Sequence, residues 1–329
     1  MIVNKRHHQI MERELLHCAK QCNRSTQSSV EKINILNVCH DLSKDILDFN
    51  YKPKAYTRFA VKEPKLREIF APSFSDRLVH CWLSNQLPPL IENTLIDDTY
   101  ANRKGKGTLA AITKVQKLMR MPKHDYFLQL DVQSFFNHIN KPILLQSLHY
   151  LIQNKGNWSP FRTRIIHHLT DAVVNHDTSR EAFDISGHKT ILASIPYHKT
   201  LSASPPGTGL PIGSMTSQIF ANYYLNPLDH YIKHTLRVKG YVRYMDDLIL
   251  LSNSKAELLS WKSSIENQLQ HSLKLNLHPT KQTLKSVSQG ANYLGYILYP
   301  HYKHIRASTL KTLQSRLNFF NWLMGYSDT

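Results

Sequence analysis

The stretch Tyr241-Val242-Arg243-Tyr244-Met245-Asp246-Asp247-Leu248-Ile249-Leu250-Leu251 places two adjacent carboxylates between two runs rich in strand-forming residues. This pattern predicts a tight β-hairpin that pushes Asp246 and Asp247 out of the sheet together. Two neighbouring anions repel each other unless a cation joins them. Mg²⁺ fits, because it takes one or two protein carboxylates and fills its octahedron with phosphates and water. The pattern suggests a metal-dependent nucleotidyl transferase, and an Asp-Asp turn on a solvated hairpin is the plainer alternative.

A third carboxylate, Asp131, ends a second predicted strand. Residues 124–136 read HDYFLQLDVQSFF, an apolar strand followed by a turn that opens a helix. In two-metal phosphoryl transfer, carboxylates hold two cations about 3.5–4 Å apart, one activating the attacking 3′ oxygen and the other steadying the leaving pyrophosphate. Three Asp residues on adjacent strands could build such a site, although the carboxylates alone do not identify the substrate.

At this point the chain closely resembles the reverse transcriptase family, which carries one Asp in an early palm strand and a Tyr-x-Asp-Asp hairpin later. Further blocks agree in order: VKEPKLREIFAP at 61–72, YANRKGKG at 100–107, LPIGSMTSQ at 210–218, LHPTK at 277–281 and YLGY at 293–296. The match spans about residues 55–300, and accidental agreement of so many blocks in order is improbable. The resemblance implies an α+β, right-hand polymerase fold with fingers, palm and an abbreviated thumb. The implied activity is that of an RNA-directed DNA polymerase.

The resemblance also implies roles for single residues. Asp131, Asp246 and Asp247 would be the catalytic residues and would ligate two Mg²⁺ ions, with Mn²⁺ as a substitute and the Val132 carbonyl as a further ligand. Phe136 would lie under the sugar and exclude a ribonucleotide 2′-OH, the alternative being an ordinary core phenylalanine. The remaining nucleotide-binding residues would be Lys62, Lys65, Arg67, Ile212, Gly213, Gln218 and Lys281.

Several of these roles stay open. Lys62, Lys65 and Arg67 offer cations for a triphosphate, and the sequence leaves open which of the two lysines contacts phosphate. Lys281 would protonate or neutralise the leaving pyrophosphate, or it is a solvated surface lysine.

The resemblance to one subfamily of reverse transcriptases rests on Ile212 and Gln218. Most reverse transcriptases have Gln before this Gly and a Ser-Pro ending, whereas Ile-Gly-x-x-x-Ser-Gln resembles the bacterial and phage enzymes of diversity-generating retroelements. Those enzymes copy a template RNA with frequent errors opposite adenine, assisted by a small basic accessory protein. The alternatives are that Ile212 is a packing substitution in a phage-defence reverse transcriptase that uses a noncoding RNA, or that the protein is a catalytically weak RNA-binding scaffold.

The block order predicts the domain limits. Residues 1–50 form a helical N-terminal extension, 51–120 and 145–210 the fingers, 121–144 and 211–296 the palm, and 297–329 a short thumb-like helix. That helix, from Ser308 to about Met324, has an apolar stripe. A polymerase thumb normally needs several helices, so an accessory protein or second subunit could supply the missing grip.

Composition agrees with a polyanionic partner. The chain has 41 Lys and Arg against 24 Asp and Glu, a net charge of +17, which favours template RNA and a DNA primer or product as partners, together with dNTPs. No apolar run approaches the roughly 20 residues of a membrane span, and the start of the chain has no secretory core, so we expect a cytoplasmic protein and no membrane partner. Cys18, Cys22, Cys39 and His40 could in principle gather around zinc, but their spacing matches no paired Cys-x-x-Cys pattern, and we expect buried or surface thiols instead.

Overall fold

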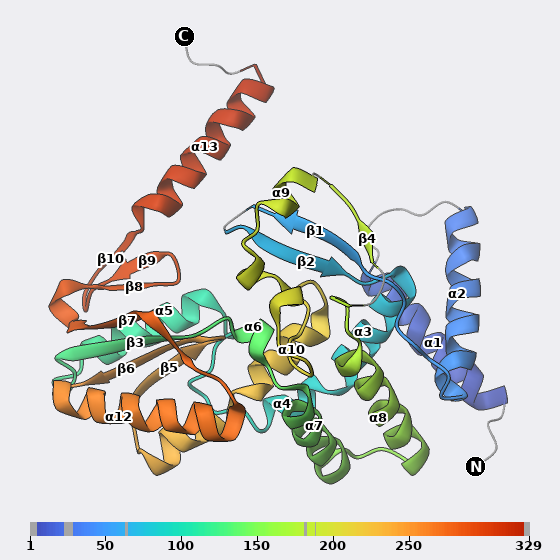
Figure 1. Ribbon diagram of the computed structural model, residues 1–329, viewed down its shortest axis with the longest axis horizontal. Coiled ribbons are helices and arrows are strands. Elements are labelled where there is room, and N and C mark those ends of the chain that lie inside the picture. Colours follow the sequence, from blue (N-terminus) through green and yellow to red (C-terminus); the bar gives the residue numbers. More distant parts are fainter. Residues whose placement is uncertain (1–4, 23–28, 63–64, 181–182, 188, 326–329) are drawn as a thin grey trace. The chain divides into compact units, whose positions relative to one another are not determined.

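The computed structural model describes residues 5–22, 29–62, 65–180, 183–187 and 189–325. The fold is α+β, with helices and mainly antiparallel sheets (Figure 1). Its α-helices are α1 (Lys5–Cys22), α2 (Ser29–Leu47), α3 (Phe74–Gln86), α4 (Pro88–Glu92), α5 (Thr108–Met119), α6 (Phe135–His138), α7 (Lys141–Lys155), α8 (Pro160–Asn175), α9 (Lys189–Ala193), α10 (Met215–Tyr224), α11 (Asn226–His230), α12 (Lys255–Gln268) and α13 (Ala307–Leu323). Short 3₁₀ turns lie at Tyr197–Lys199, Leu201–Ala203 and Val287–Gln289, and π-helical turns at Tyr231–Thr235 and Leu269–Leu273.

The chain divides into two compact units. Unit 1 comprises Met1–Leu95, Gln133–Pro227 and Leu269–Leu275, and unit 2 comprises Ile96–Val132, Leu228–Gln268 and Asn276–Thr329. The division brings together segments that are distant in the sequence, and each unit is described by itself below.

Unit 1 contains one small sheet and most of the helices. Strand β1 (Thr57–Val61) pairs antiparallel with β2 (Arg67–Ala71) and parallel with β4 (Asp184–Ile185). A buried carboxylate, Glu68, ties this sheet to the loop that follows α9. It accepts hydrogen bonds from the Arg58 Nε at 2.6 Å and from the Leu201 backbone N–H at 2.7 Å. A charge-assisted bond to a buried acceptor is worth more than a neutral one, so Glu68 fixes the loop 199–210 on the sheet.

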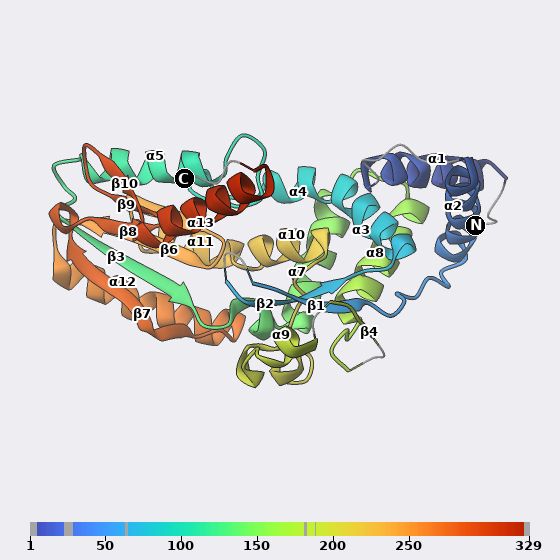
Figure 2. The ribbon, with the colours of Figure 1, turned by 90° about the horizontal axis from the view of Figure 1, so that it is seen from above.

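Unit 2 is built around a four-stranded antiparallel sheet in the order β5-β6-β3-β7, with β5 (Gly240–Tyr244), β6 (Asp247–Ser252), β3 (Tyr126–Val132) and β7 (Leu277–Ser286). Figure 2 shows α5 on one face of this sheet and α12 on the other. The two covered faces explain why β6 reads as a continuous apolar run, Leu248–Leu251, rather than as an alternating one.

A second sheet of unit 2 has the order β10-β9-β8, with β8 (Ala291–Tyr293), β9 (Tyr296–Leu298) and β10 (Lys303–Ile305). Helix α13 follows it, within one residue at each end of the helix that the apolar periodicity predicts. Every described side chain of α13 is exposed, so the stripe Leu310, Leu313, Leu317, Phe320 and Leu323 faces solvent. No helix in the described part of the chain combines the length and the apolar character needed to cross a membrane.

Candidate active site

The hairpin of β5 and β6 has a two-residue loop, Met245-Asp246. Tyr244 pairs with Asp247, which is therefore the first residue of β6. The prediction of a hairpin is confirmed, but the prediction that both carboxylates leave the sheet is wrong, because so short a loop leaves only Asp246 outside the ladder. Met245 has a φ of +55°, a left-handed conformation that is uncommon for a residue other than glycine.

Asp131 and Asp247 face each other across neighbouring strands. They are direct partners in the antiparallel register of β3 and β6, and the Cβ atoms of such partners lie about 4.5–5.5 Å apart. The Val132 backbone N–H also donates to the Asp246 carbonyl oxygen at 3.3 Å. The strand end and the hairpin tip thus bring three carboxyl-bearing residues to one edge of the sheet.

The pairing of β3 with β7 is interrupted opposite Asp131. Leu130 pairs with Gln282 but Val132 pairs with Leu277, so residues 278–281 bulge from the ladder. The His278 Nδ1 accepts the backbone N–H of Lys281 at 3.3 Å, and the Gln282 amide donates to the His278 carbonyl at 3.0 Å. Bulges beside functional sites commonly re-aim a side chain, and this one turns Lys281 toward the carboxylates.

The Lys281 Nζ lies 2.7 Å from the Asp131 Oδ2. This ammonium offsets part of the repulsion between the carboxylates at this edge. Because 58% of the lysine side chain is exposed, water screens the pair and its contribution to stability is small. Lys281 thus contacts one of the predicted catalytic residues, which a lysine on an unrelated surface would not do.

The donor set of this edge fits a divalent metal. No group of three or more His, Cys, Asp or Glu side chains in the described ranges is arranged to hold a metal ion. Mg²⁺, however, is usually held by only one or two carboxylates, with phosphates and water completing its shell. The register partners Asp131 and Asp247 supply two such oxygen donors side by side, and Asp246 follows in the adjoining loop. These residues are therefore the ones that would hold it.

A buried ion pair between Arg243 and Asp229, called the brace below, supports the β5–β6 hairpin. The Arg243 Nε donates to the Asp229 Oδ1 at 2.8 Å and its terminal nitrogen to the Oδ2 at 2.5 Å, and both side chains have no exposed surface. Another guanidinium nitrogen of Arg243 donates to the Met245 carbonyl at 3.0 Å, and the Tyr241 hydroxyl donates to the Asp229 Oδ1 at 2.7 Å. The guanidinium therefore links the loop beside Asp246 to a fixed anion.

The protonation states of Arg243 and Tyr241 in this cluster follow from burial and from the charge of Asp229. Burial disfavours the charged guanidinium, but the Asp229 carboxylate outweighs that effect and raises the pKa of Arg243 above its ordinary value. Burial, followed by the charge of Asp229, raises the pKa of Tyr241 well above its usual range. Arg243 is thus charged and Tyr241 neutral at any physiological pH.

No sequence motif indicates a role for Asp229 or Arg243. A signal was present, because a charged residue inside the apolar run Tyr241–Leu251 requires a buried partner. The partner could not be identified from the sequence, because Asp229 lies outside that run and is brought to it by the packing of α11 against the sheet.

Unit 1 holds the predicted nucleotide-binding residues other than Lys281, which lies in unit 2. Lys62 and Lys65 lie in the segment between β1 and β2, and Arg67 is the first residue of β2; all three side chains are exposed. Three exposed cations thus lie where β1 connects to β2. The structure does not favour either lysine as the phosphate contact.

The segment 210–218 leads from the loop into α10. The Ile212 carbonyl accepts the Phe70 backbone N–H at 2.8 Å, and the Ile212 side chain is half-buried. Gly213 has a φ of +138°, and a Cβ at this position would lie 2.3 Å from the Phe70 carbonyl oxygen. Glycine is therefore required here both for its conformation and for the close approach of β2. Gln218 lies on α10 with an exposed side chain.

Phe136 lies on α6 and is half-buried. Its ring packs edge-on against Phe135 at a centroid distance of 5.6 Å, and its carbonyl accepts the Leu210 backbone N–H at 2.8 Å. Phe135 is the buried member of the pair, at 2% exposure. Phe136 thus keeps part of its ring exposed, and its backbone is tied to the start of the Gly213 segment.

A buried histidine secures the start of α10. The His80 Nε2 lies 2.7 Å from the Tyr56 hydroxyl and its Nδ1 lies 2.7 Å from the Thr216 Oγ1. Burial, reinforced by the nearby His176, lowers the pKa of His80 to about 3. The ring is therefore neutral at physiological pH and holds Thr216, three residues after Gly213, against α3. No sequence motif indicates this role for His80.

Comparison with known proteins agrees with this geometry. The reverse transcriptase (RNA-dependent DNA polymerase) family matches residues 53–298, and no curated protein matches the chain. Among solved structures, the apo telomerase of Candida tropicalis is similar at a TM-score of 0.53 and 10% identity, over 77% of this chain and 48% of that one. The telomerase of Candida albicans in complex with a fragment of telomeric RNA aligns at a TM-score of 0.49 and 13% identity, over 84% of this chain and 51% of that one.

The chain spans about half the length of these telomerase chains. At so low an identity the likeness to the Candida tropicalis structure shows the fold alone, a right-hand polymerase fold. The family match covers well over half of the chain and includes all the acidic residues of the site. The chain therefore belongs to the reverse transcriptase family.

Proposed function

We propose that the protein is an RNA-directed DNA polymerase that adds dNTPs to a primer 3′ end by two-metal phosphoryl transfer. The observation that carries this proposal is the pairing of Asp131 with Asp247 on adjacent strands, with Asp246 in the adjoining loop. Membership of the reverse transcriptase family supports it. An Asp-Asp turn that is merely solvated would require neither Asp131 on the adjacent strand nor the buried ion pair of Asp229 and Arg243.

Asp131, Asp246 and Asp247, with the Val132 carbonyl, would hold two Mg²⁺ ions, for which Mn²⁺ can substitute. When bound, the ions would supply Lewis-acid activation of the 3′ oxygen and charge stabilisation at the pyrophosphate. Lys281 would release Asp131 and protonate or neutralise the leaving pyrophosphate, since its side chain is 58% exposed and carries its charge on a flexible four-carbon chain.

The exposed cations of unit 1 would bind the triphosphate. Arg67 offers a planar fork of N–H donors, and Lys62 or Lys65 offers a point charge. Gly213 would let the backbone approach the nascent base pair, with Ile212 and Gln218 beside it. Phe136 would exclude the 2′-OH of a ribonucleotide, which is why dNTPs are the proposed substrates.

For the biological role we propose error-prone copying of a template RNA, as in diversity-generating retroelements. Ile212 supports this, because a branched apolar side chain offers the nascent pair shape but no hydrogen bond. A small basic accessory protein, or a second subunit, is the proposed protein partner. Synthesis from a noncoding RNA in phage defence is the other role that this chemistry allows.

Primer extension tests the proposed activity. Purified protein is incubated with an RNA template, an annealed DNA primer and dNTPs, in parallel reactions with Mg²⁺, Mn²⁺ or Ca²⁺. We expect template-dependent extension with Mg²⁺ and Mn²⁺ and none with Ca²⁺, whose longer metal–oxygen distances do not suit the transition state. No incorporation under any condition, including with the RNA and partner proteins encoded beside it, would favour the RNA-binding scaffold instead.

A further inference from the structure

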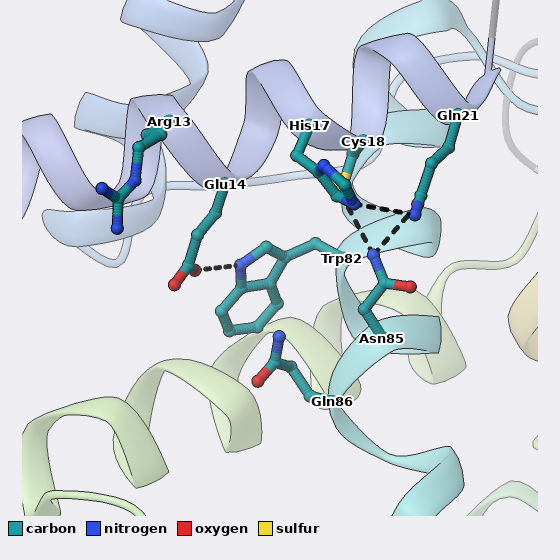
Figure 3. Close-up of a pocket in the computed structure, with 8 residues that line it drawn as sticks. All are labelled: Arg13, Glu14, His17, Cys18, Gln21, Trp82, Asn85 and Gln86. Atoms are coloured by element: carbon teal, nitrogen blue, oxygen red, sulfur yellow. Dashed lines mark hydrogen bonds between the residues drawn. The ribbon is translucent and has the colours of Figure 1, made fainter.

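A cavity of about 450 Å³ lies between α1 and α3 in unit 1 (Figure 3). Most of its polar groups hold one another. The Trp82 Nε1 donates to Glu14 at 2.7 Å, and the Asn85 amide donates to the Gln21 Oε1 at 3.1 Å. Groups that already have partners offer a ligand few hydrogen bonds. The sheet of β8, β9 and β10 in unit 2 differs, because it presents stacked aromatic rings to solvent.

Tyr299 and Tyr302 form a stacked pair at the turn between β9 and β10. Their ring centroids lie 4.5 Å apart, with an angle of 19° between the planes. The His304 ring meets both edge-on, at 6.0 Å from Tyr299 and 5.2 Å from Tyr302. Tyr299 is the inner ring, since a Cβ added to Gly290 would come within 2.7 Å of it. Tyr302 is 54% exposed, so the face that Tyr299 does not cover can accept a further planar ring.

Hydrogen bonds from the backbone and from α5 hold this turn. The Tyr299 N–H donates to the Tyr302 carbonyl at 2.9 Å, and Pro300 fixes a φ angle between them. The Gln116 amide of α5 donates to the carbonyls of both tyrosines, at 3.0 Å and 2.9 Å. The rings are therefore in place before a ligand arrives, and such a preorganised surface avoids the cost of being ordered on binding.

The chain around the stack carries positive charge and no carboxylate. Residues 99–124, which include α5, and residues 267–327, which include β7 to β10 and α13, contain no Asp or Glu, although the chain has 24. Arg306 continues the face of β10 that carries Tyr302 and His304, because residues two apart in a strand share a face.

The contacts of Arg306 agree with this placement. Its guanidinium lies 3.5 Å from the Asn292 Oδ1 on β8, and Asn292 is in line with His304, since Ile297 pairs with both across the sheet. One face of the sheet thus carries an open aromatic stack, a histidine and a guanidinium. Aromatic rings beside cations are the combination that binds unpaired nucleotides.

We propose that the face formed by Tyr302, His304 and Arg306 binds unpaired nucleotides of the template RNA outside the candidate active site. One base would stack on Tyr302, and Arg306 would contact a phosphate. The site suits a single strand, because the base faces of a duplex are covered by neighbouring pairs. The inference rests on the proposed function for the identity of that strand: newly made DNA stays paired with its template, so the unpaired strand is RNA.

Binding of single-stranded RNA to the full chain tests the stacking contact. The probe is a fluorescein-labelled, unstructured RNA of about 12 nucleotides, and fluorescence anisotropy gives its Kd. Tyr302→Ala should weaken this binding about fivefold or more, whereas Tyr302→Phe keeps the ring and should bind like the wild type. Tyr150→Ala, which removes another exposed tyrosine, on α7, is the control and should also bind like the wild type. A blunt RNA duplex should bind Tyr302→Ala and wild type equally.

The salt dependence of the Kd tests Arg306 separately. Loss of one phosphate contact should reduce the slope of log Kd against log salt by about 0.7 for a single strand. We expect this reduction for Arg306→Gln and not for Tyr302→Ala, because stacking releases no counterion. Lys303→Gln is the matched control, since Lys303 lies on the opposite face of β10, over the Tyr296 ring at 5.7 Å, and should keep the wild-type slope.

Three results would overturn the proposal: a wild type that does not bind the single strand, a Tyr302→Ala variant that binds it equally well, or equal losses on single strand and duplex. Unchanged RNA binding would instead assign the exposed rings to a protein partner. Primer extension keeps this failure apart from that of the proposed activity. Wild type that extends primers while Tyr302→Ala binds RNA normally contradicts only the stacking site, whereas weakened binding without extension by any form contradicts only the polymerase. Circular dichroism of each variant shows that the fold persists.

Discussion

Asp131 and Asp247 depend on a single register for their proximity. A slip of one residue between β3 and β6 would move one carboxylate to the opposite face of the sheet, since side chains alternate with a period of two. Leu130 and Leu248 are also partners in this register and both are buried, so the pair next to the two carboxylates packs in the core. The position of the candidate metal ligands therefore follows from the burial of the residues beside them.

Phe136 gives a prediction about sugar selectivity. Phe136→Ala should open space beside the 2′ position and raise the efficiency of ribonucleotide incorporation by roughly ten- to hundredfold relative to dNTPs. The ratio of kcat/KM for dNTP and rNTP measures this. Phe135→Leu is the control, since Phe135 packs in the core and should leave the ratio unchanged. Equal discrimination in wild type and Phe136→Ala would show that Phe136 is not the gate.

Ile212 gives a prediction about fidelity. Ile212→Gln adds a side chain that can hydrogen-bond to the nucleotide or template, and about 1 kcal/mol of extra discrimination would lower misincorporation about fivefold. The effect should be largest opposite template adenine. Sequencing of cDNA made on one template by wild type, Ile212→Gln and the control Ile212→Val measures it. Identical error spectra for all three would make Ile212 a packing residue and remove the main support for the diversifying role.

Among the elements, the hairpin of β5 and β6 is held by its buried ion pair. Asp229→Asn removes the charge opposite Arg243 and leaves a buried guanidinium uncompensated, which should lower the free energy of unfolding by about 3–5 kcal/mol. Urea unfolding measures the loss. Lys114→Gln is the control, because it breaks a partly exposed pair with Asp98 that should be worth about 1 kcal/mol or less. Equal losses in the two variants would mean that the brace does not support the hairpin.

The contact of α3 with α10 makes stability depend on pH through His80. The folded pKa is about 3 and the unfolded one 6.5, so only the unfolded state gains this proton between those values. Stability contributed by the neutral ring is therefore complete above pH 6.5 and is lost as the pH falls toward 3. The loss amounts to about 2 kcal/mol between pH 6.5 and about 5.

His80→Gln should remove this pH dependence, while the control His301→Gln, at an exposed position, should keep it. Unfolding free energies of the three proteins at pH 6.5 and pH 5 provide the measurement. A wild-type protein that is no more acid-sensitive than His80→Gln would contradict the neutral, buried state of the ring.

The elements differ in how far the sequence predicts them. The hairpin, the strand ending near Asp131 and α13 follow from local periodicity and are observed. The bulge at 278–281 and the brace between Asp229 and Arg243 could not be predicted, because each depends on segments that meet only in the folded chain. The apolar stripe of α13 is also observed, but periodicity alone does not reveal that it remains exposed.

For the whole molecule, the net charge of +17 suits a nucleic acid partner and predicts nothing about the fold. The predicted domain limits follow the order of motif blocks and stay a prediction. The compact units instead combine three separate segments each, a grouping set by long-range packing. The residues proposed to hold metal fall in unit 2 together with Lys281, whereas the other residues proposed to bind the nucleotide fall in unit 1.

The most direct test of the central claim is primer extension by Asp246→Asn, measured beside RNA binding. The substitution removes one metal-ligand charge from the hairpin loop but leaves the basic surface intact, so we predict loss of nucleotide addition with a nearly unchanged Kd for template RNA. Asn318→Ala, an exposed change on α13, is the control and should extend the primer like wild type. Full activity of Asp246→Asn would contradict the assignment of this hairpin as the catalytic site.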